Sequence, residues 1–334
     1  MLLLQIFCSK YRPKPLSIET FLHHGENSSR VVSYSFLKHE IPTRLAGLLL
    51  EFNLQPSILQ KQKSFREVRD DHLQTFCDLV DFPDKPSEAD LEAFDETLIA
   101  IRKRHADTVS QLAEAVMETK FDLEDSQQEL SKGMEDAIQY FLDRMYMTRI
   151  STRMLYNQHI YIHGDNVAKP RHVGQIDPYC DVVTSVRRAY DEAGKLCEAH
   201  YGRRPELVIQ SSNKSSAEAT DVPVLFAYVP SHLHHMIFEV LKNSMRATVD
   251  YAASQGTEMS PIRVLISKTD VDITIKISDQ GGGIPRALMD NLFKYMYTTA
   301  GRLGRAHADL VKNSEVPPMA GLGYGLPLSR LYAR

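Results

Sequence analysis

The chain has 334 residues, which is more than one hydrophobic core usually fills, so two domains are expected. Its apolar fraction of 43% is typical of a folded globular protein, and its formal net charge of −4 disfavours broad nucleic-acid binding. The four scattered cysteines form no CxxC pair, which argues against a zinc site or a disulfide scaffold. No apolar run approaches the length of about 20 residues that a membrane-spanning helix needs.

The first half of the chain is predicted to be helical. A short helix begins after Ser17, which is a suitable N-cap, and the longer ones carry apolar residues at steps of three and four. The predicted helices cover residues 16–22, 41–53, 91–120 and 130–158. Long amphipathic helices with short links and no strand pattern indicate an antiparallel helical bundle, assigned here to residues 1–163.

The segment 164–178 is rich in Gly, Pro and polar residues and is predicted to be an interdomain linker. The remaining residues, 179–334, mix helices with strands. Helices are predicted at 182–200, 231–250 and 326–334, and strands at 206–210, 224–229, 262–268 and 271–278. The last two strands alternate around Thr269-Asp270 as in a β-hairpin. We therefore expect an α+β domain with an antiparallel or mixed sheet, truncated at its C-terminal end because the helical pattern continues to Arg334.

The helix at 231–250 carries a polar face of mixed chemistry: His235, Glu239, Lys242, Asn243 and Arg246. A solvated stripe is the ordinary alternative, but this mixture suits a polyanion with a metal better than it suits water. Asn243 offers a neutral oxygen, which fits Mg²⁺ held mainly by phosphate oxygens and waters. Glu239 lies one turn earlier, where a group that removes a proton from an attacking hydroxyl would have to be. His235 can pair with Glu239 at i, i+4, or it is a packing or capping histidine.

A first glycine cluster follows the predicted hairpin. Asp279 closes the second strand, and Gly281 and Gly283 follow it. A carboxylate at a strand end can accept a hydrogen bond from an exocyclic amine such as that of adenine, and the glycines let the backbone approach a flat ring. A plain glycine turn is an equally weighted alternative for this motif alone.

A second glycine cluster, Gly321, Gly323 and Gly325, precedes the last predicted helix. A glycine-rich turn into a helix N-terminus presents unpaired N–H groups to a phosphate. No GK[ST] follows, so this is not a Walker A loop, and the βαβ context of a Rossmann fingerprint is missing.

These three segments together resemble the ATP-binding motifs of the superfamily that contains gyrase, gyrase-type heat-shock chaperones, histidine kinases and MutL. Glu239-x-x-Lys242-Asn243 resembles its N box, and the two glycine clusters resemble its two glycine boxes. Within the superfamily, the chain is most similar to the mitochondrial protein kinases of 2-oxoacid dehydrogenases, above all the pyruvate dehydrogenase kinases. The matching segments are PSHLHHMIFEVLKNSMRAT, SDQGGGIP, LFKYMYTTA and GLGYGLPLSRLYAR, with PLSIETFL, SFLKHEIPTRLA, IRKRH and RISTRMLYNQH in the first half.

The resemblance implies a four-helix regulatory domain followed by an α/β sandwich that binds ATP and Mg²⁺. It implies phosphorylation of serine on the E1α subunit of the pyruvate dehydrogenase complex, in the mitochondrial matrix, which inactivates the dehydrogenase. By the same resemblance Glu239 is the general base, His235 its partner, and Asn243 the magnesium ligand. The residues expected to line the nucleotide are Glu239, Lys242, Asn243, Arg246, Asp279 (at adenine), Gly281, Gly283, Thr298, Thr299, Gly321, Leu322, Gly323, Tyr324, Gly325 and Leu326. Residues 300–320 are expected to form a lid over the phosphates.

Two further sites follow from the resemblance in the helical domain. Arg102, His105, Arg149 and Arg153 match a pocket for pyruvate-like 2-oxoacids, with salt bridges to Asp143 or Glu114 as the structural alternative. The positions expected to receive the lipoyl group of the E2 core are Leu16, Phe21 and Phe36. A homodimer is also implied.

Three other functions are kept as alternatives. A branched-chain 2-oxoacid dehydrogenase kinase would use the same chemistry on a different E1 subunit. A histidine kinase ranks lower because no dimerisation helix with a phosphoacceptor His precedes the ATP-binding motifs. An ATP-gated binding protein would bind nucleotide without transferring phosphate.

Overall fold

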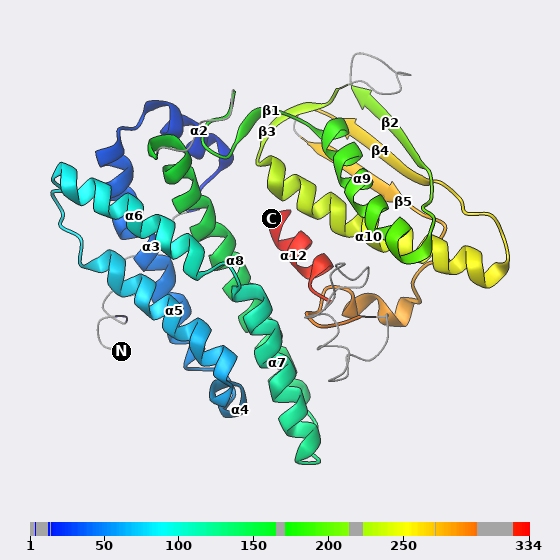
Figure 1. The fold of residues 1–334 in the computed structure, drawn as a ribbon, viewed down its shortest axis with the longest axis horizontal. Coiled ribbons are helices and arrows are strands. Elements are labelled where there is room, and N and C mark those ends of the chain that lie inside the picture. Colours follow the sequence, from blue (N-terminus) through cyan, green and yellow to red (C-terminus); the bar gives the residue numbers. More distant parts are fainter. Residues whose placement is uncertain are drawn as a thin grey trace. The chain divides into compact units, whose positions relative to one another are not determined.

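The computed structural model describes Leu4, Pro13 and residues 15–164, 171–213, 223–270, 272–298 and 323–334. The chain divides into two compact units, Met1–Ile176 and Asp177–Arg334. Each unit is described by itself (Figure 1).

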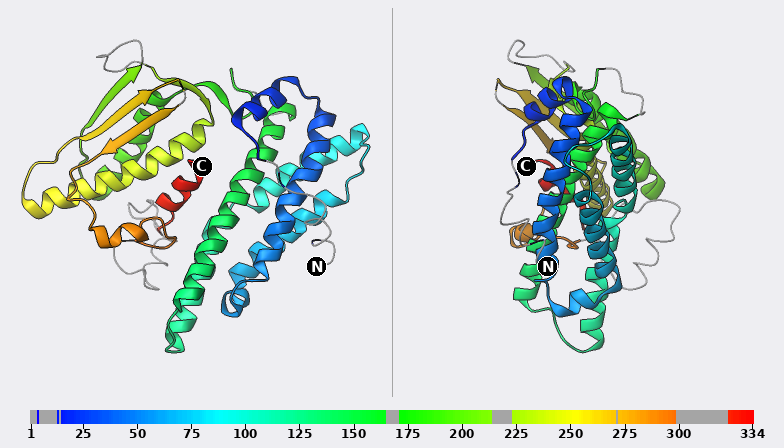
Figure 2. Two further views of the ribbon diagram at one scale, coloured as in Figure 1. Left: turned by 180° about the vertical axis from the view of Figure 1, so that it is seen from behind. Right: turned by 90° about the vertical axis from the view of Figure 1, so that its left-hand side faces the viewer.

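The first unit is entirely helical over its described residues, apart from a single bridge between Val173 and Ile176. Its helices are α2 (Ile18–Asn27), α3 (Arg30–Phe52), α4 (Ser57–Lys61), α5 (Lys63–Val80), α6 (Glu88–Arg104), α7 (Thr108–Asp125) and α8 (Lys132–His163). The long segments α3, α5, α6 continued by α7, and α8 lie side by side, as the views in Figures 1 and 2 agree. This is the bundle of four helical segments that the sequence led us to expect.

The core of the helical unit comes from regular apolar stripes. On α3, Tyr34, Leu37, Ile41 and Leu45 recur at steps of three and four and are all buried. They pack with buried residues of α5, α6 and α8, of which Phe94 is fully covered. The amphipathic period therefore fixes which face of each helix points inward.

The predicted single helix over 91–120 is wrong. The structure ends α6 at Arg104 and begins α7 at Thr108, with His105 and Asp107 in non-helical conformations. The apolar spacing continues across the break, so periodicity alone does not reveal it. The bend is instead supported from α8, where Arg149 Nη2 donates to the main-chain oxygens of His105 (3.1 Å) and Ala106 (3.4 Å).

The second unit contains a mixed sheet covered by helices on one face. Its elements are β1 (Asp177–Asp181), α9 (Val182–Tyr201), β2 (Leu207–Asn213), β3 (Leu225–Tyr228), α10 (Pro230–Gln255), β4 (Ile262–Lys268), β5 (Ile273–Ser278), a 3₁₀ helix η1 (Arg286–Asn291) and α12 (Gly325–Tyr332). The order is β2-β4-β5, with β2 parallel and β5 antiparallel to β4, and β1 pairs with β3 in a separate antiparallel ribbon. α9 and α10 pack together along the sheet, and α12 lies against α10 (Figures 1 and 2).

The hairpin prediction is confirmed: β4 pairs with β5 from Lys268↔Ile273 to Arg263↔Ser278. The alternating burial of β4 places Ile262, Val264 and Ile266 in the core with α9 and α10. The structure corrects one boundary. The first two residues of strand β1 fall in the segment 164–178, which was predicted to be a linker.

Candidate active site

Helix α10 supplies one wall of a large cavity in the second unit. It begins at Pro230, where a missing N–H is tolerated, and ends at Gln255, followed by the C-cap Gly256, whose φ of +63° suits glycine. Ile237 and Leu241 on one side of the helix are buried in the core. The other side therefore presents its polar residues to the cavity.

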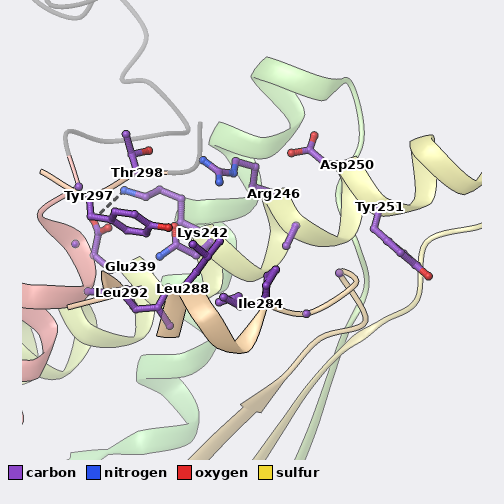
Figure 3. Close-up of a pocket in the computed structure, with 18 of the residues that line it drawn as sticks. Glu239, Lys242, Arg246, Asp250, Tyr251, Ile284, Leu288, Leu292, Tyr297 and Thr298 are labelled. Carbon is purple, nitrogen blue, oxygen red and sulfur yellow. Dashed lines mark hydrogen bonds and ion pairs between the residues drawn. The ribbon is translucent and has the colours of Figure 1, made fainter. Parts of the chain in front are cut away.

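The cavity has a volume of about 530 Å³, which is within the usual range for small-molecule sites. A second wall comes from the turn after β5 and from η1, and a third from residues 297–298 and the start of α12 (Figure 3). The lining residues are Glu239, Lys242, Asn243, Arg246, Ala247, Asp250, Tyr251, Ser254, Gly281, Gly283, Ile284, Pro285, Leu288, Leu292, Tyr297, Thr298, Gly323, Gly325, Leu326 and Pro327. Ten of the residues predicted from sequence thus lie around one cavity.

Glu239 and Lys242 form an ion pair within this cavity. Lys242 Nζ lies 2.9 Å from Glu239 Oε1, and the two side chains are only 10% and 14% exposed. The ammonium also lies 5.3 Å from the centroid of the Phe238 ring. Figure 3 shows the pair beside Tyr297 and Thr298.

The first glycine cluster closes against α10. Asp279 Oδ1 accepts the N–H of Gly281 at 3.0 Å. A Cβ on Gly281 would lie 2.5 Å from Cβ of Ala247, so the backbone passes close to the helix only because this residue is glycine. Gly282, with φ of +82°, lies against the ring of Tyr251. Asp279 itself is exposed and lies beside the cavity, outside the set of residues that line it.

The second glycine cluster is described from Gly323 onward. Gly323 has φ of +78°, and its main-chain oxygen accepts the N–H of Met296 at 3.2 Å. Tyr324 is buried, with its ring centroid 5.5 Å from that of Tyr295, and does not line the cavity. The remaining predicted residues of this region, namely Thr299, Gly321, Leu322 and the lid 300–320, lie outside the described residues.

His235 is mostly buried one turn before Glu239, and the centroids of its ring and that of Tyr332 are 5.2 Å apart. Burial lowers the pKa of His235, although the charge of Glu239 opposes the shift. Its Nε2 has no hydrogen-bond partner among the described residues. The described partner of Glu239 is therefore Lys242, and the predicted pairing of His235 with Glu239 stays a prediction.

Several lining residues escaped the sequence analysis. Asp250 and Ser254 follow the predicted Arg246 at steps of four on α10, so the polar face seen in the sequence extends by two turns. Ile284 and Leu288 form the apolar wall, and no motif marks them because they belong to an irregular segment and a short 3₁₀ helix.

A smaller pocket of about 80 Å³ lies in the helical unit. Leu16, Phe21 and Phe36, predicted together from sequence, all line it, along with Ser33 and His159. The other lining residues are Thr20, His24, Gly25, Leu37, Leu155, Gln158, Ile162 and His163. The structure therefore brings these three residues to one apolar pocket.

One wall of this small pocket is fixed by a chain of polar contacts. His159 Nδ1 lies 2.7 Å from Ser33 Oγ, and His159 Nε2 lies 2.7 Å from Asp95 Oδ1. Arg30 donates to Asp95 Oδ2 through Nε (3.1 Å) and Nη2 (2.7 Å). Burial alone would raise the pKa of Asp95, but the contacts from His159 and Arg30 outweigh it and lower that pKa.

Three of the predicted 2-oxoacid residues, Arg102, His105 and Arg149, lie at the break between α6 and α7. His105 is 6% exposed, its Nε2 lies 2.8 Å from Thr75 Oγ1, and its ring centroid is 4.2 Å from that of His72. Burial lowers the pKa of His72 to about 4. Burial, with the charges of His72, Arg104 and Arg149, lowers the pKa of His105 to about 2. Arg102 and Arg153 are half-buried.

The folds and the cavity define the class of protein: a helical unit followed by an ATP-binding unit of the gyrase and histidine-kinase type. Residues 228–334 match the family described as "Histidine kinase-, DNA gyrase B-, and HSP90-like ATPase". Residues 15–177 match the family described as "Mitochondrial branched-chain alpha-ketoacid dehydrogenase kinase".

Comparisons over 98% of the chain then identify the particular family. The chain is 44% identical over 331 residues, 98% of its length and 78% of the relative's, to the mitochondrial [pyruvate dehydrogenase (acetyl-transferring)] kinase of Drosophila melanogaster. It is 42% identical over 330 residues to human isozyme 4 (98% and 77%) and 42% identical over 331 residues to human isozyme 3 (98% and 78%). The chain belongs to the family of mitochondrial pyruvate dehydrogenase (acetyl-transferring) kinases. Within the described residues, no helix combines the length and apolar character needed to cross a bilayer.

Proposed function

We propose that this protein transfers the γ-phosphoryl group of ATP to a serine of the E1α subunit of the pyruvate dehydrogenase complex, in the mitochondrial matrix, and thereby inactivates it. One observation carries the proposal. The Glu239 carboxylate lines the same cavity as Asn243 and the glycine turn at Gly325. The names of the relatives, which are pyruvate dehydrogenase (acetyl-transferring) kinases, support this choice of substrate.

Glu239 acts as the general base in this proposal. Its carboxylate takes the proton from the serine hydroxyl while the hydroxyl oxygen forms a bond to the γ-phosphorus. The bond between that phosphorus and the β–γ bridging oxygen breaks, and ADP leaves. Arg246 and the N–H groups at the start of α12 would offset phosphate charge. His235, if it acts, acts through Glu239.

Asn243 is the residue proposed to hold Mg²⁺. Its amide lines the cavity next to Glu239 and Arg246. Within the described residues, no three His, Cys, Asp or Glu side chains converge as a metal cage. A single amide oxygen from Asn243 fits a cation that is held mainly by nucleotide phosphates and waters. When bound, Mg²⁺ supplies charge neutralisation at those phosphates.

The adenine end of the nucleotide is assigned to the first glycine cluster. Asp279 would accept the exocyclic amine, while Gly281 and Gly283 allow close approach of the backbone. The residues proposed to contact the rest of the nucleotide are Lys242, Thr298, Thr299 and the segment 321–326, including Gly321, Leu322, Gly323, Tyr324, Gly325 and Leu326. Residues 300–320 would close over it.

A phosphorylation assay with a single carboxylate change tests the proposal. The full chain and Glu239→Gln are each incubated with labelled ATP, Mg²⁺ and the dehydrogenase complex. We expect acid-stable phosphoserine on E1α with the original chain and none above background with Glu239→Gln, while calorimetry shows retained ATP binding. Equal labelling by both proteins would remove Glu239 from the chemistry.

A second candidate substrate is the E1 subunit of the branched-chain 2-oxoacid dehydrogenase. It is favoured by the match of residues 15–177 to the family described for that kinase. Parallel assays with the two E1 substrates at equal concentration distinguish the candidates, and we expect faster labelling of the pyruvate enzyme.

Three interactions are proposed for the protein outside its nucleotide cavity. The pocket lined by Leu16, Phe21 and Phe36 would receive the lipoyl group of the E2 core, because it is apolar and closed on one side by fixed polar contacts. A pyruvate-like 2-oxoacid would bind through Arg102, His105, Arg149 and Arg153. A homodimer is also proposed, supported by family membership. A lipoylated domain that binds the chain no better than its unlipoylated form would exclude the docking role.

A further inference from the structure

The two oxygens of the Glu239 carboxylate have different surroundings. Oε1 accepts a hydrogen bond from Lys242 Nζ at 2.9 Å. Oε2 lies against the backbone of Gly325, in the space that any side chain at that position would occupy. One oxygen is therefore engaged by a cation, and the other points at a residue with no side chain.

Lys242 is itself held in place. The residue is 8% exposed, and its ammonium lies 5.3 Å from the centroid of the Phe238 ring. A buried ammonium is unfavourable unless it is paired, and Glu239 is its ion-pair partner. An exposed i, i+3 ion pair would sample many geometries. Burial of both side chains restricts this pair to few geometries.

We propose that Lys242 is a positioning residue for phosphoryl transfer, which fixes the Glu239 carboxylate so that Oε2 is the oxygen that accepts the proton of the substrate hydroxyl. This inference rests on the proposed role of Glu239. Lys242 holds Oε1, and Gly325 leaves the room that Oε2 needs. The proton moves from the hydroxyl to Oε2, the hydroxyl oxygen bonds to phosphorus, and the leaving ADP takes the electrons of the broken P–O bond.

This role differs from direct contact with the nucleotide, which the resemblance implied for Lys242. A lysine that binds phosphate stabilises bound ATP, so its loss raises the Kd for ATP. A lysine that aims the base acts only on the reaction of bound substrates, so its loss lowers kcat. Arg246 lines the same cavity one turn later on α10, and it provides a matched cation for which phosphate binding remains the expected role.

The experiment compares Lys242→Met, Lys242→Arg and Arg246→Met in the full chain. Calorimetry gives the Kd for ATP, and steady-state labelling of E1 gives kcat and KM. For Lys242→Met we expect kcat to fall about 100-fold, as for a misplacement of a reacting group by about 1 Å, with the Kd for ATP changed less than about threefold. For Lys242→Arg we expect a kcat at least about tenfold higher than that of Lys242→Met, because a guanidinium can still donate to Oε1. Arg246→Met shows the opposite pattern, with the larger effect on Kd.

Two results separate failure of this inference from failure of the proposed function. If Lys242→Met raises the Kd for ATP at least tenfold and leaves kcat at saturating ATP unchanged, Lys242 is a phosphate ligand and the inference is overturned. If Glu239→Gln retains kcat, the proposed base is wrong whatever Lys242 does. Should Lys242→Met fail to fold in a thermal melt, Lys242→Leu, which also cannot donate a hydrogen bond to Oε1, is measured instead, and an unchanged kcat in that variant also overturns the inference.

Discussion

At the scale of single residues, two glycines of the same turn exclude a side chain for different structural reasons. A Cβ on Gly325 would overlap the end of the flexible Glu239 side chain. A Cβ on Gly323 would lie 2.5 Å from the main-chain oxygen of Tyr297, at a φ of +78° that side-chain-bearing residues rarely adopt. The first clash can be relieved by rotating a carboxylate, whereas the second requires the backbone to move.

We therefore expect Gly325→Ala to fold normally but to lose activity. Glu239 must leave its position, so kcat should fall at least about tenfold, while the melting temperature changes by no more than a few degrees. Gly323→Ala is the matched comparison, and it should be destabilised by about 1 to 3 kcal/mol. Kinetics with thermal melts of both variants check this, and a fully active Gly325→Ala protein would contradict it.

The buried pair of His72 and His105, whose ring centroids lie 4.2 Å apart, predicts an acid-sensitive fold. The folded pKa values of about 4 and about 2 lie below the ordinary value of 6.5, so the unfolded chain binds protons that the folded chain does not. The contribution of the two imidazoles to the free energy of unfolding is therefore fully present above about pH 6.5. It is lost as the pH falls, by about 1 kcal/mol per imidazole at pH 5.5.

Urea midpoints at pH 7.5 and 5.5 test this expectation. His72→Phe should lose less stability between the two pH values than the original chain, because only His105 then remains of the pair. His23→Phe, at an exposed position, is the control and should leave the pH dependence unchanged. An identical acid loss in His72→Phe would show that this imidazole is not involved.

At the scale of elements, Asp95 on α6 links α3 and α8 through Arg30 and His159. Asp95→Asn removes a largely buried charge and leaves the Arg30 guanidinium with the exposed Glu88 as its described ion-pair partner, so we expect the free energy of unfolding to fall by about 2 kcal/mol. The control is Asp70→Asn, whose partner Arg69 is its exposed neighbour in sequence, and its effect should stay below about 0.5 kcal/mol. Denaturant unfolding measures both, and equal effects would contradict the linking role.

The helices and strands also show which features of the fold can be predicted from sequence patterns. Helix α2 begins after Ser17, as the cap predicts, because Ser17 Oγ accepts the N–H of Thr20. Helix α3 begins at Arg30 and not near Ile41, although Pro42 is typical of a first turn. Strand β1 was missed because its sequence, Asp-Pro-Tyr-Cys-Asp, lacks the alternation on which strand prediction depends. Both helix starts have a local serine cap, since Ser29 Oγ accepts the N–H of Val32, whereas β1 depends on pairing with β3, which is distant in the sequence.

The candidate site, like the fold, could be predicted from the sequence only in part. The spacing of Glu239, Asn243 and Arg246 predicts that they share one face of a helix, and in the structure all three line the cavity. The Lys242 pairing and the contact of Gly325 with Glu239 were not predictable. The first depends on rotamers within the cavity, and the second joins residues 86 positions apart in the sequence.

At the scale of the whole molecule, each unit has buried apolar clusters of its own. All residues that line the large cavity belong to the second unit, and all the contacts described for Asp95 belong to the first. The length of the chain predicted two domains, and the structure places their division at Ile176–Asp177.

This division predicts that nucleotide affinity is independent of stability in the helical unit. Asp95→Asn should lower the resistance of the helical unit to urea but leave the Kd for ATP, measured by calorimetry, within about twofold of the original value. ATP at 100 times its Kd should stabilise the second unit by about 2.7 kcal/mol in both proteins. A tenfold change in Kd for Asp95→Asn would instead reveal coupling between the units.

Tyr251 lies on Gly282 at the edge of the cavity with 43% of its surface exposed, and the chain contains no tryptophan. Replacing Tyr251 by tryptophan would therefore give the protein a single indole at the mouth of its nucleotide cavity. Its emission would then follow filling and emptying of the cavity in real time, in the unlabelled enzyme and in the presence of its protein substrates.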